Sequence, residues 1–99
     1  MLTKERIKHL KNYTEEELLK ITYKSFAVNE INTLISETPM TDQEKRIAVM
    51  RFNKEMSFQE IADAENIDVK TARNKCTLIS SKIRTTLIYI VFFGQEEYN

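Results

Sequence analysis

This 99-residue chain has few of the residues that make turns and cross-links. It contains one glycine, one proline, one cysteine and no tryptophan. So little glycine and proline leaves few sites for the tight turns of hairpins, which makes strands unexpected and an all-helical fold the prediction. The length suits one domain with a modest hydrophobic core.

The single cysteine and the shortage of long apolar runs exclude several kinds of site. Cys76 has no second cysteine for a disulfide, and with His9 as the one histidine it cannot complete a zinc site. We expect no metal, no cofactor and a reducing, cytoplasmic setting. Residues 1–10 are charged throughout, unlike a signal peptide. The apolar run Leu87–Phe93 is too short to span a bilayer, so no membrane partner is expected.

Net charge is also lacking, because fifteen basic residues balance fifteen acidic ones. The charges are nevertheless unevenly placed, with glutamates at residues 15–17 near one end and at 96 and 97 near the other. Between them, residues 69–86 carry no acidic side chain and five basic ones, namely Lys70, Arg73, Lys75, Lys82 and Arg84. On its own such a run is equally well explained as a solvated helix face.

The stretch from residue 57 to residue 84 predicts two helices joined by a tight turn. Ser57 and Glu60 have the spacing of a capping box, so the first helix should begin directly after the serine. Asn66 tolerates the left-handed conformation that a turn between helices demands. Asp68 can cap a second helix that starts at the next residue. Two helices in this order form a helix-turn-helix.

The N-terminal part of the chain is expected to hold a short helix over Lys4–Lys11 and a long one over Glu15–Glu37. The alternative is that the long helix breaks into two at the polar stretch Asn29–Asn32. Thr14 and Glu17 form the capping box that opens the long helix. Its apolar residues cover more than the single stripe of a surface helix, so it is either central in the domain or in contact with another chain. Pro39 ends the segment, because the residue before a proline disfavours helix.

A further capping box, Thr41 with Glu44, predicts a helix from Asp42 to about Asn53 directly before the helix-turn-helix. The expected fold is therefore all-α, a small domain of four to five helices with a helix-turn-helix and a long C-terminal recognition helix. Its expected parts within one compact domain are N-terminal helices for the core and dimerisation (1–39), the helix-turn-helix (40–86) and an apolar extension with an acidic tail (87–99).

Residues 40–62 resemble the region four domain of bacterial sigma factors. The Arg-Phe pair at Arg51 and the Ser-x-x-Glu-Ile-Ala run from Ser57 match the family's pattern. The family's recognition helix has Thr-Val-Arg at its start and Lys-Leu-Arg further on. Here Thr-Ala-Arg from Thr71 and Lys-Ile-Arg from Lys82 stand at that spacing.

This resemblance covers about residues 28–86 and implies a sequence-specific DNA-binding transcription regulator that uses the helix-turn-helix of residues 57–84. Glu55 and Asn66 depart from the family, which favours glycine at both turns, so slightly remodelled turns are expected. The chain has no room for the promoter-melting part of a complete sigma factor. A small regulator of the phage or mobile-element type, or one half of a split factor, fits this resemblance better.

The first two turns of an inserted recognition helix read the bases. Four residues share one stripe there, at i, i+3, i+4 and i+7, and are expected to read bases: Lys70, Arg73, Asn74 and Thr77. Arginine suits guanine and asparagine suits adenine, and each paired contact is worth about 1–3 kcal/mol of discrimination. Contacts to DNA phosphates are expected from Gln59, Thr71, Lys75, Lys82, Arg84, Arg46 and Lys54. For Lys82 and Arg84 a structural role is about equally well supported.

The opposite face of the recognition helix is expected to be core, and it consists of Ala72, Cys76, Ile79, Ile83 and Leu87. The run Leu87–Phe93 has apolar side chains on every side. Together with the Glu15–Glu37 helix it is expected to form a homodimer, which would suit paired DNA half-sites. The alternative is that both segments complete one small core.

Double-stranded DNA is the expected partner, and RNA polymerase is a possible second one. Two rival interpretations remain open from the residues. One is a protein-interaction module that binds RNA polymerase or another regulator, and the other is the DNA-binding subunit of a phage packaging machine. No enzyme is expected, because the sequence has no paired-carboxylate, nucleophile–base or phosphate-loop constellation.

Overall fold

The computed structural model describes residues 2–94, and every regular element in this part of the chain is helical. The α-helices are α1 (Lys4–Leu10), α2 (Glu15–Lys20), α3 (Val28–Glu37), α4 (Asp42–Ala48), α5 (Phe58–Glu65) and α6 (Val69–Phe92). A 3₁₀ turn lies at Tyr23–Ser25 and a π-helical turn at Val49–Asn53. The all-α prediction is confirmed, with six α-helices in place of four to five. The acidic tail residues Glu96 and Glu97 lie outside the described residues.

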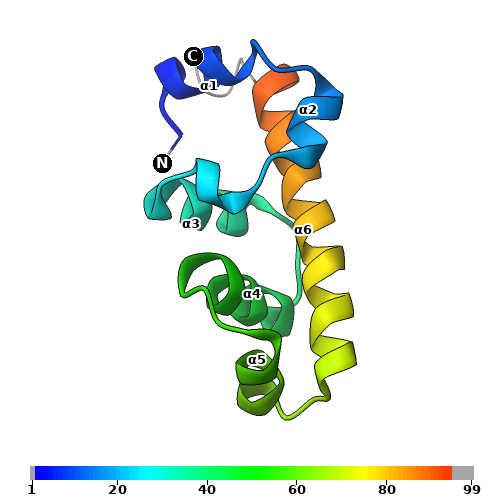
Figure 1. Cartoon of the computed structure of the whole chain (residues 1–99). Helices are drawn as coiled ribbons and strands as arrows, with labels where there is room; N and C mark the ends of the chain where they lie inside the picture. The colour runs from blue at the N-terminus through cyan, green and yellow to red at the C-terminus, as the bar shows by residue number, and fades with distance from the viewer. Residues whose placement is uncertain (1, 95–99) are drawn as a thin grey trace.

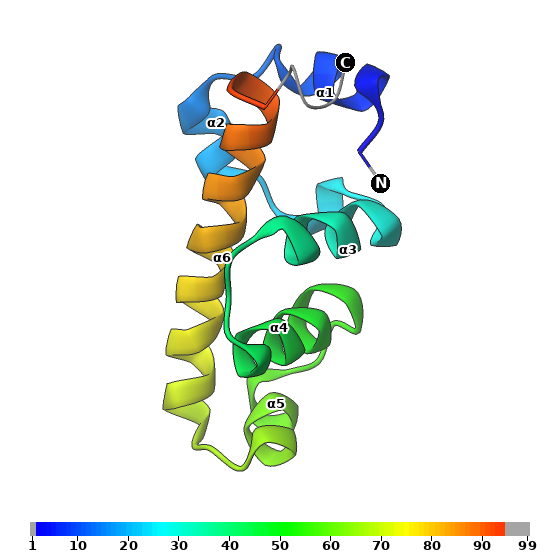
Figure 2. The ribbon, with the colours of Figure 1, turned by 180° about the vertical axis from the view of Figure 1, so that it is seen from behind.

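The helix α6 is the longest element, and each of the other five α-helices packs against it. Its 24 residues correspond to about 36 Å of helix, close to the 42 Å long dimension of the described chain. Figures 1 and 2 show the other helices stacked along α6, with α5 beside its N-terminal end and α2 beside its C-terminal end. None of the helices within residues 2–94 is long and apolar enough to cross a membrane.

Two clusters of buried residues lie along α6. The first joins α3, α4, α5 and the N-terminal half of α6, and includes Ile47, Ile61 and Ile79. The second joins α1, α2, α3 and the C-terminal end of α6, and includes Leu10 and Leu18. Because α3 and α6 contribute to both clusters, the two halves form one folded unit, and Pro39 does not separate them. The predicted core face of α6 is confirmed, with four residues buried and Ile83 half-buried.

The prediction of one long helix over Glu15–Glu37 is wrong, because the chain leaves the helical path between α2 and α3. Two arginines that are distant in sequence hold this break. The Nε group of Arg84 on α6 donates to the carbonyl oxygen of Ile21 at 2.9 Å. The Nη2 group of Arg6 on α1 donates to the carbonyl oxygen of Ser25 at 2.6 Å. In a continuous helix these carbonyls would accept from backbone N–H groups, and here the guanidinium groups replace those donors.

The predicted helix starts are confirmed, and so is the predicted left-handed conformation of Asn66. The side chain at each predicted cap accepts from the backbone N–H three residues on, at Thr14, Thr41, Ser57 and Asp68. Asn66 ends α5 in the left-handed region, with φ 57° and ψ 47°. Glu55 also has a positive φ, of 55°. Both turns therefore keep a backbone conformation that usually favours glycine.

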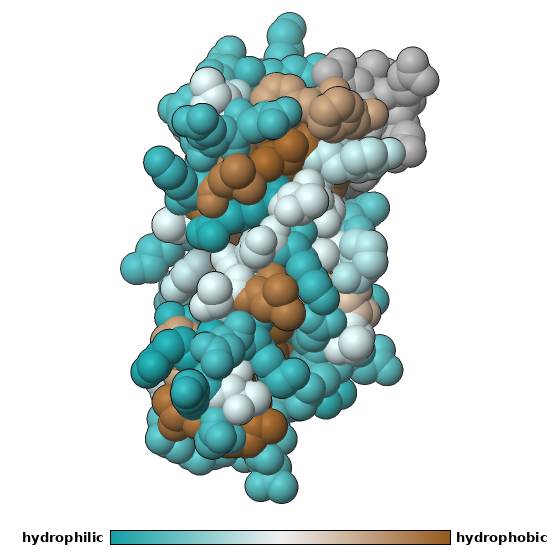
Figure 3. All heavy atoms as spheres, turned by 90° about the vertical axis from the view of Figure 1, so that its right-hand side faces the viewer, coloured by the Kyte–Doolittle hydropathy of each residue, from teal (hydrophilic) through white to brown (hydrophobic). Residues whose placement is uncertain are grey.

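The apolar C-terminal end of α6 is used mainly within the protein. Leu87, Ile90 and Val91 are buried in the second cluster. Tyr89 and Phe93 remain 53% and 67% exposed, with ring centroids 6.3 Å apart. Figure 3 looks at the α6 side and shows the exposed apolar residues as separate groups divided by hydrophilic ones. A dimer through this end would have a smaller apolar surface than the sequence predicts.

Glu44 connects α4 to α6. Its carboxylate accepts from the backbone N–H of Thr41 at 2.9 Å and from Nζ of Lys82 at 2.7 Å. The hydrogen bond from Lys82, followed by the one from the Thr41 backbone, lowers the pKa of Glu44 from 4.5 to about 2. The ionised form of this carboxyl is therefore favoured by folding.

We predict that Glu44→Gln makes the stability of the protein less dependent on acid pH. Glutamine keeps the capping box but loses the charge pair. A carboxyl with a depressed folded-state pKa stabilises above its unfolded pKa and loses that contribution as pH falls through the folded value. The free energy of unfolding should thus fall more steeply for the wild type than for the variant between pH 4.5 and about 2.

Urea unfolding at a series of pH values measures this difference. Glu37→Gln is the matched control, because Glu37 is an exposed carboxylate on α3. It should leave the pH dependence near that of the wild type. If Glu44→Gln also leaves it unchanged, the pair with Lys82 contributes nothing to acid sensitivity.

Candidate nucleic-acid interface

The first turns of α6 present the four predicted base-reading residues to solvent. Lys70, Arg73, Asn74 and Thr77 are all exposed, on the side of the helix away from its buried face. The start of this helix is fixed by Asp68, whose carboxylate accepts from the backbone N–H of Thr71 at 2.6 Å. That backbone hydrogen bond is the main cause that lowers the pKa of Asp68. An ionised cap thus sets the position from which the exposed stripe projects.

The ring of Phe58, the first residue of α5, contacts two arginines at this face, and one of them, Arg73, belongs to the stripe. The guanidinium carbon of Arg73 lies 5.6 Å from the centroid of the Phe58 ring. That of Arg51 lies 4.2 Å from the same centroid. Arg51 also donates from Nη1 to the carbonyl oxygen of Met56 at 2.9 Å. Cation–π contacts of this kind restrict where a guanidinium can point.

The seven predicted phosphate contacts fall into two groups. Arg46, Lys82 and Arg84 are bonded within the protein. Arg46 donates to both carboxylate oxygens of Glu65 at 3.0 and 2.9 Å, and these bonds raise the pKa of Arg46 and lower that of Glu65. Gln59 is also bonded within the protein, since its Nε2 donates to Oδ1 of Asp63 at 2.9 Å. Of the other three, Lys75 and Lys54 make no ion pair within residues 2–94, and Thr71 is uncharged.

A phosphate that approached Lys82 or Arg46 would have to compete with a carboxylate already in place. The sequence could not show that Lys82 and Arg46 are paired with carboxylates, because the partners Glu44 and Glu65 lie on other helices. We therefore assign Lys82 and Arg46 to internal ion pairs, and the interface that we consider below does not depend on them.

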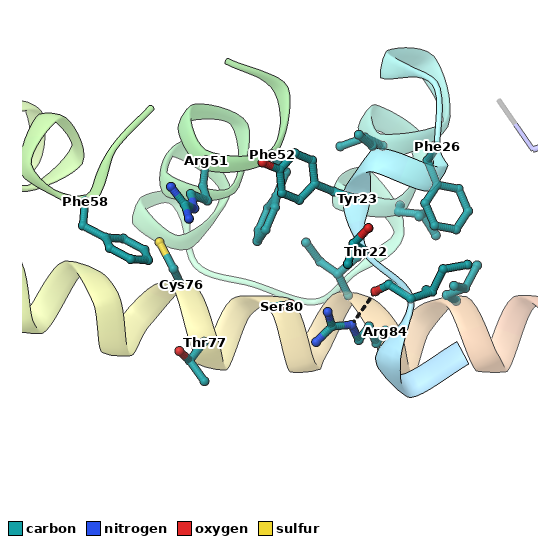
Figure 4. A pocket seen from close by; sticks show the side chains of 15 residues that line it. Thr22, Tyr23, Phe26, Arg51, Phe52, Phe58, Cys76, Thr77, Ser80 and Arg84 are labelled. Carbon is teal, nitrogen blue, oxygen red and sulfur yellow. Dashed lines mark hydrogen bonds between the residues drawn. The ribbon is translucent and has the colours of Figure 1, made fainter. Parts of the chain in front are cut away.

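A pocket of about 310 Å³ lies next to the exposed stripe, between the two core clusters. As Figure 4 shows, α6 forms one side of it and the segments around the 3₁₀ turn, the π-helical turn and the start of α5 form the other. Aromatic rings from three segments line it, from Tyr23, Phe26, Phe52 and Phe58. The residues that α6 contributes include Cys76, Thr77, Ser80 and Arg84. Thr77 therefore belongs to both the stripe and the pocket wall.

Cys76 is a wall residue of this pocket, only 5% exposed. Burial is the main cause that raises the pKa of its thiol, and the nearby Arg51 acts in the opposite direction. This agrees with the predicted role of a small buried group. Within residues 2–94 there is no cluster of histidine, cysteine, aspartate and glutamate side chains arranged to hold a metal ion.

Three residues at this face had no functional role assigned from the sequence. Arg51 entered only as part of the family pattern, and Phe58 only as the start of a helix. Leu78 on α6 is 54% exposed, which is unusual for leucine in a helix that supplies core on its other side. The contact between Arg51 and Phe58 could not be predicted from the sequence. The sequence shows only that an arginine and an aromatic residue flank a turn that ends in a helix cap.

No protein-family model, curated protein or solved structure matches this chain. The similarity to region four of sigma factors therefore rests on the residues given above.

Proposed function

We propose that the protein is a sequence-specific DNA-binding transcription regulator that uses α5 and α6 as a helix-turn-helix. The observation that supports this proposal most is the exposed stripe of Lys70, Arg73, Asn74 and Thr77, on a helix that has no acidic residue between 69 and 86. The whole chain is neutral, so positive potential is a local property of this helix.

In this proposal the N-terminal half of α6 enters the major groove. Arg73 donates to O6 and N7 of a guanine, and Asn74 pairs with N6 and N7 of an adenine. The contact with Phe58 restricts Arg73 before DNA arrives, which lowers the entropy that the side chain loses on binding. The exposed Leu78 is suited to an apolar contact with a thymine methyl group.

Phosphate contacts position such a helix without reading sequence. Lys75, Lys54, Gln59 and Thr71 are the residues that we propose for this role, because the two lysines make no ion pair in the described part of the chain. Gln59 would exchange its hydrogen bond to Asp63 for one to a phosphate. A cytoplasmic setting belongs to the same proposal, since that is where a phage or bacterial regulator meets DNA.

The test is a binding selection from a pool of random duplexes, followed by titration of the recovered motif. Wild-type protein should recover a short motif. Arg73→Ala should lose preference at one base position, at a cost of about 1–3 kcal/mol for the preferred base. Lys75→Ala should weaken binding to all duplexes and reduce the salt slope by about one. Lys8→Ala, an exposed lysine on α1 at the other end of the molecule, is the control.

Two results would contradict the proposal at different levels. If Arg73→Ala and Lys75→Ala lose the same binding affinity on every duplex sequence, Arg73 does not read a base. Absence of binding to any duplex at low salt would remove DNA as the partner. The second result would favour the rival interpretation, a module that binds RNA polymerase or another regulator.

We also propose that the protein forms a homodimer through the C-terminal end of α6. The structure leaves the exposed, stacked rings of Tyr89 and Phe93 for this contact, and Leu19 on α2, a helix that packs on α6, is 48% exposed. A two-fold contact would place two recognition helices on paired half-sites.

Light scattering at high concentration should give a dimer mass for the wild type. Tyr89→Ser combined with Phe93→Ser should give a monomer, because the apolar contact area is lost. Leu78→Ser, an exposed leucine on α6 outside this end, should leave the dimer intact. A monomer mass for the wild type at all concentrations would exclude the homodimer.

A further inference from the structure

We propose that the pocket between the two core clusters is a binding site for a small organic anion with an apolar body. Neither its shape nor its charge is explained by DNA reading alone. The volume of about 310 Å³ lies at the lower end of the range for small-molecule sites, about 300–1,000 Å³. Such a space suits a body of one or two rings and excludes a long lipid chain.

The apolar part of the ligand would meet aromatic and aliphatic walls. Tyr23 and Phe52 lie with ring centroids 5.4 Å apart and an angle of 60° between the ring planes. Phe26 and Phe58 add two further rings, and Ile83 on α6 adds an aliphatic side chain. Rings of this kind prefer tilted or offset contacts with another flat apolar group.

The negative charge of the ligand is inferred from how the arginines are distributed. Arg6 and Arg46 each pair with a glutamate. The remaining three of the five arginines have no carboxylate within 4.0 Å in residues 2–94. Two of the three, Arg51 and Arg84, line this pocket, and the third, Arg73, contacts the Phe58 ring in its wall. An oxyanion would supply the partner that the protein itself does not.

Arg84 is the residue best placed to hold that oxyanion. Its Nε group is bonded to the carbonyl oxygen of Ile21 at 2.9 Å, which fixes the guanidinium plane (Figure 4). Within the described chain its two Nη groups make no hydrogen bond, so they remain available as donors. A fixed guanidinium binds a carboxylate, sulfonate or phosphate with directed, charge-assisted hydrogen bonds.

Occupancy of this pocket would also affect DNA binding, a consequence that rests on the proposed function. Thr77 is shared between the pocket wall and the base-reading stripe. A bound anion would lower the positive potential around Arg73, so DNA should bind more weakly when the pocket is filled. Because the coupling is reciprocal, bound DNA would lower the affinity of the protein for the anion by the same factor.

The experiment uses two dyes with the same apolar body on the full chain, without DNA. Anilinonaphthalenesulfonate carries a sulfonate, and phenylnaphthylamine is its uncharged counterpart. Fluorescence titration should show saturable binding of one molecule of each, with the sulfonate about tenfold tighter, as expected for hydrogen bonds to a charged group. Arg84→Gln should remove this tenfold advantage and leave the neutral dye unchanged.

Two further variants locate the site. Ser80→Phe places a ring in the pocket and should lower the affinity for both dyes at least tenfold. Lys24→Gln removes an exposed positive charge from the 3₁₀ turn without altering the pocket wall, and it should change neither dye. Circular dichroism and the urea midpoint of each variant separate a lost site from a lost fold.

Equal affinity of the wild type for both dyes would overturn the preference for an anion. Unchanged binding in Ser80→Phe, with the fold intact, would overturn the pocket as the site. In a separate measurement, a saturating concentration of the sulfonate dye should lower the affinity of the protein for the selected duplex several-fold. Dye binding with no change in DNA affinity would overturn the coupling alone, and failure to bind any duplex would be a failure of the proposed function.

Discussion

The fold depends on one long helix that serves both clusters of the core. The other α-helices have between six and ten residues, below the roughly 12–15 at which an isolated helix becomes stable in water. Each therefore needs the packing that α6 provides. Because α6 spans the molecule, its exposed N-terminal stripe and the pocket wall are parts of one rigid element.

The break between α2 and α3 shows how polar contacts shape this apolar framework. A continuous helix there would satisfy its own carbonyl groups, yet Arg84 and Arg6 satisfy those of Ile21 and Ser25 in its place. The break brings Tyr23 into the wall that faces α6. Two guanidinium groups therefore donate to carbonyl oxygens at the break, and one of the two, that of Arg84, also lines the pocket.

The sequence predicted the features that neighbouring residues determine, namely where helices start and which face of α6 is buried. Capping residues such as Ser57 and Asp68 marked helix starts, and the spacing of apolar residues marked the buried face of α6. The break at Ile21 could not be predicted in this way, because its donor is 63 positions away in the sequence. The pocket was missed for a related reason. Its walls come from separate segments, and no spacing within one segment reports on them.

The allocation of charge explains how a neutral chain can present a positive face. Lys70 and Lys82 are both lysines on the same helix, and the sequence distinguishes them only by their distance from the start of that helix. In the fold, Glu44 captures Lys82 at 2.7 Å, while Glu30 and Glu65 capture Arg6 and Arg46 on other helices. Each internal pair cancels a positive charge away from the stripe. The three arginines without an ion pair in the described residues, Arg51, Arg73 and Arg84, lie at the start of α6 or in contact with the pocket wall. Local potential, more than total charge, steers an anionic partner.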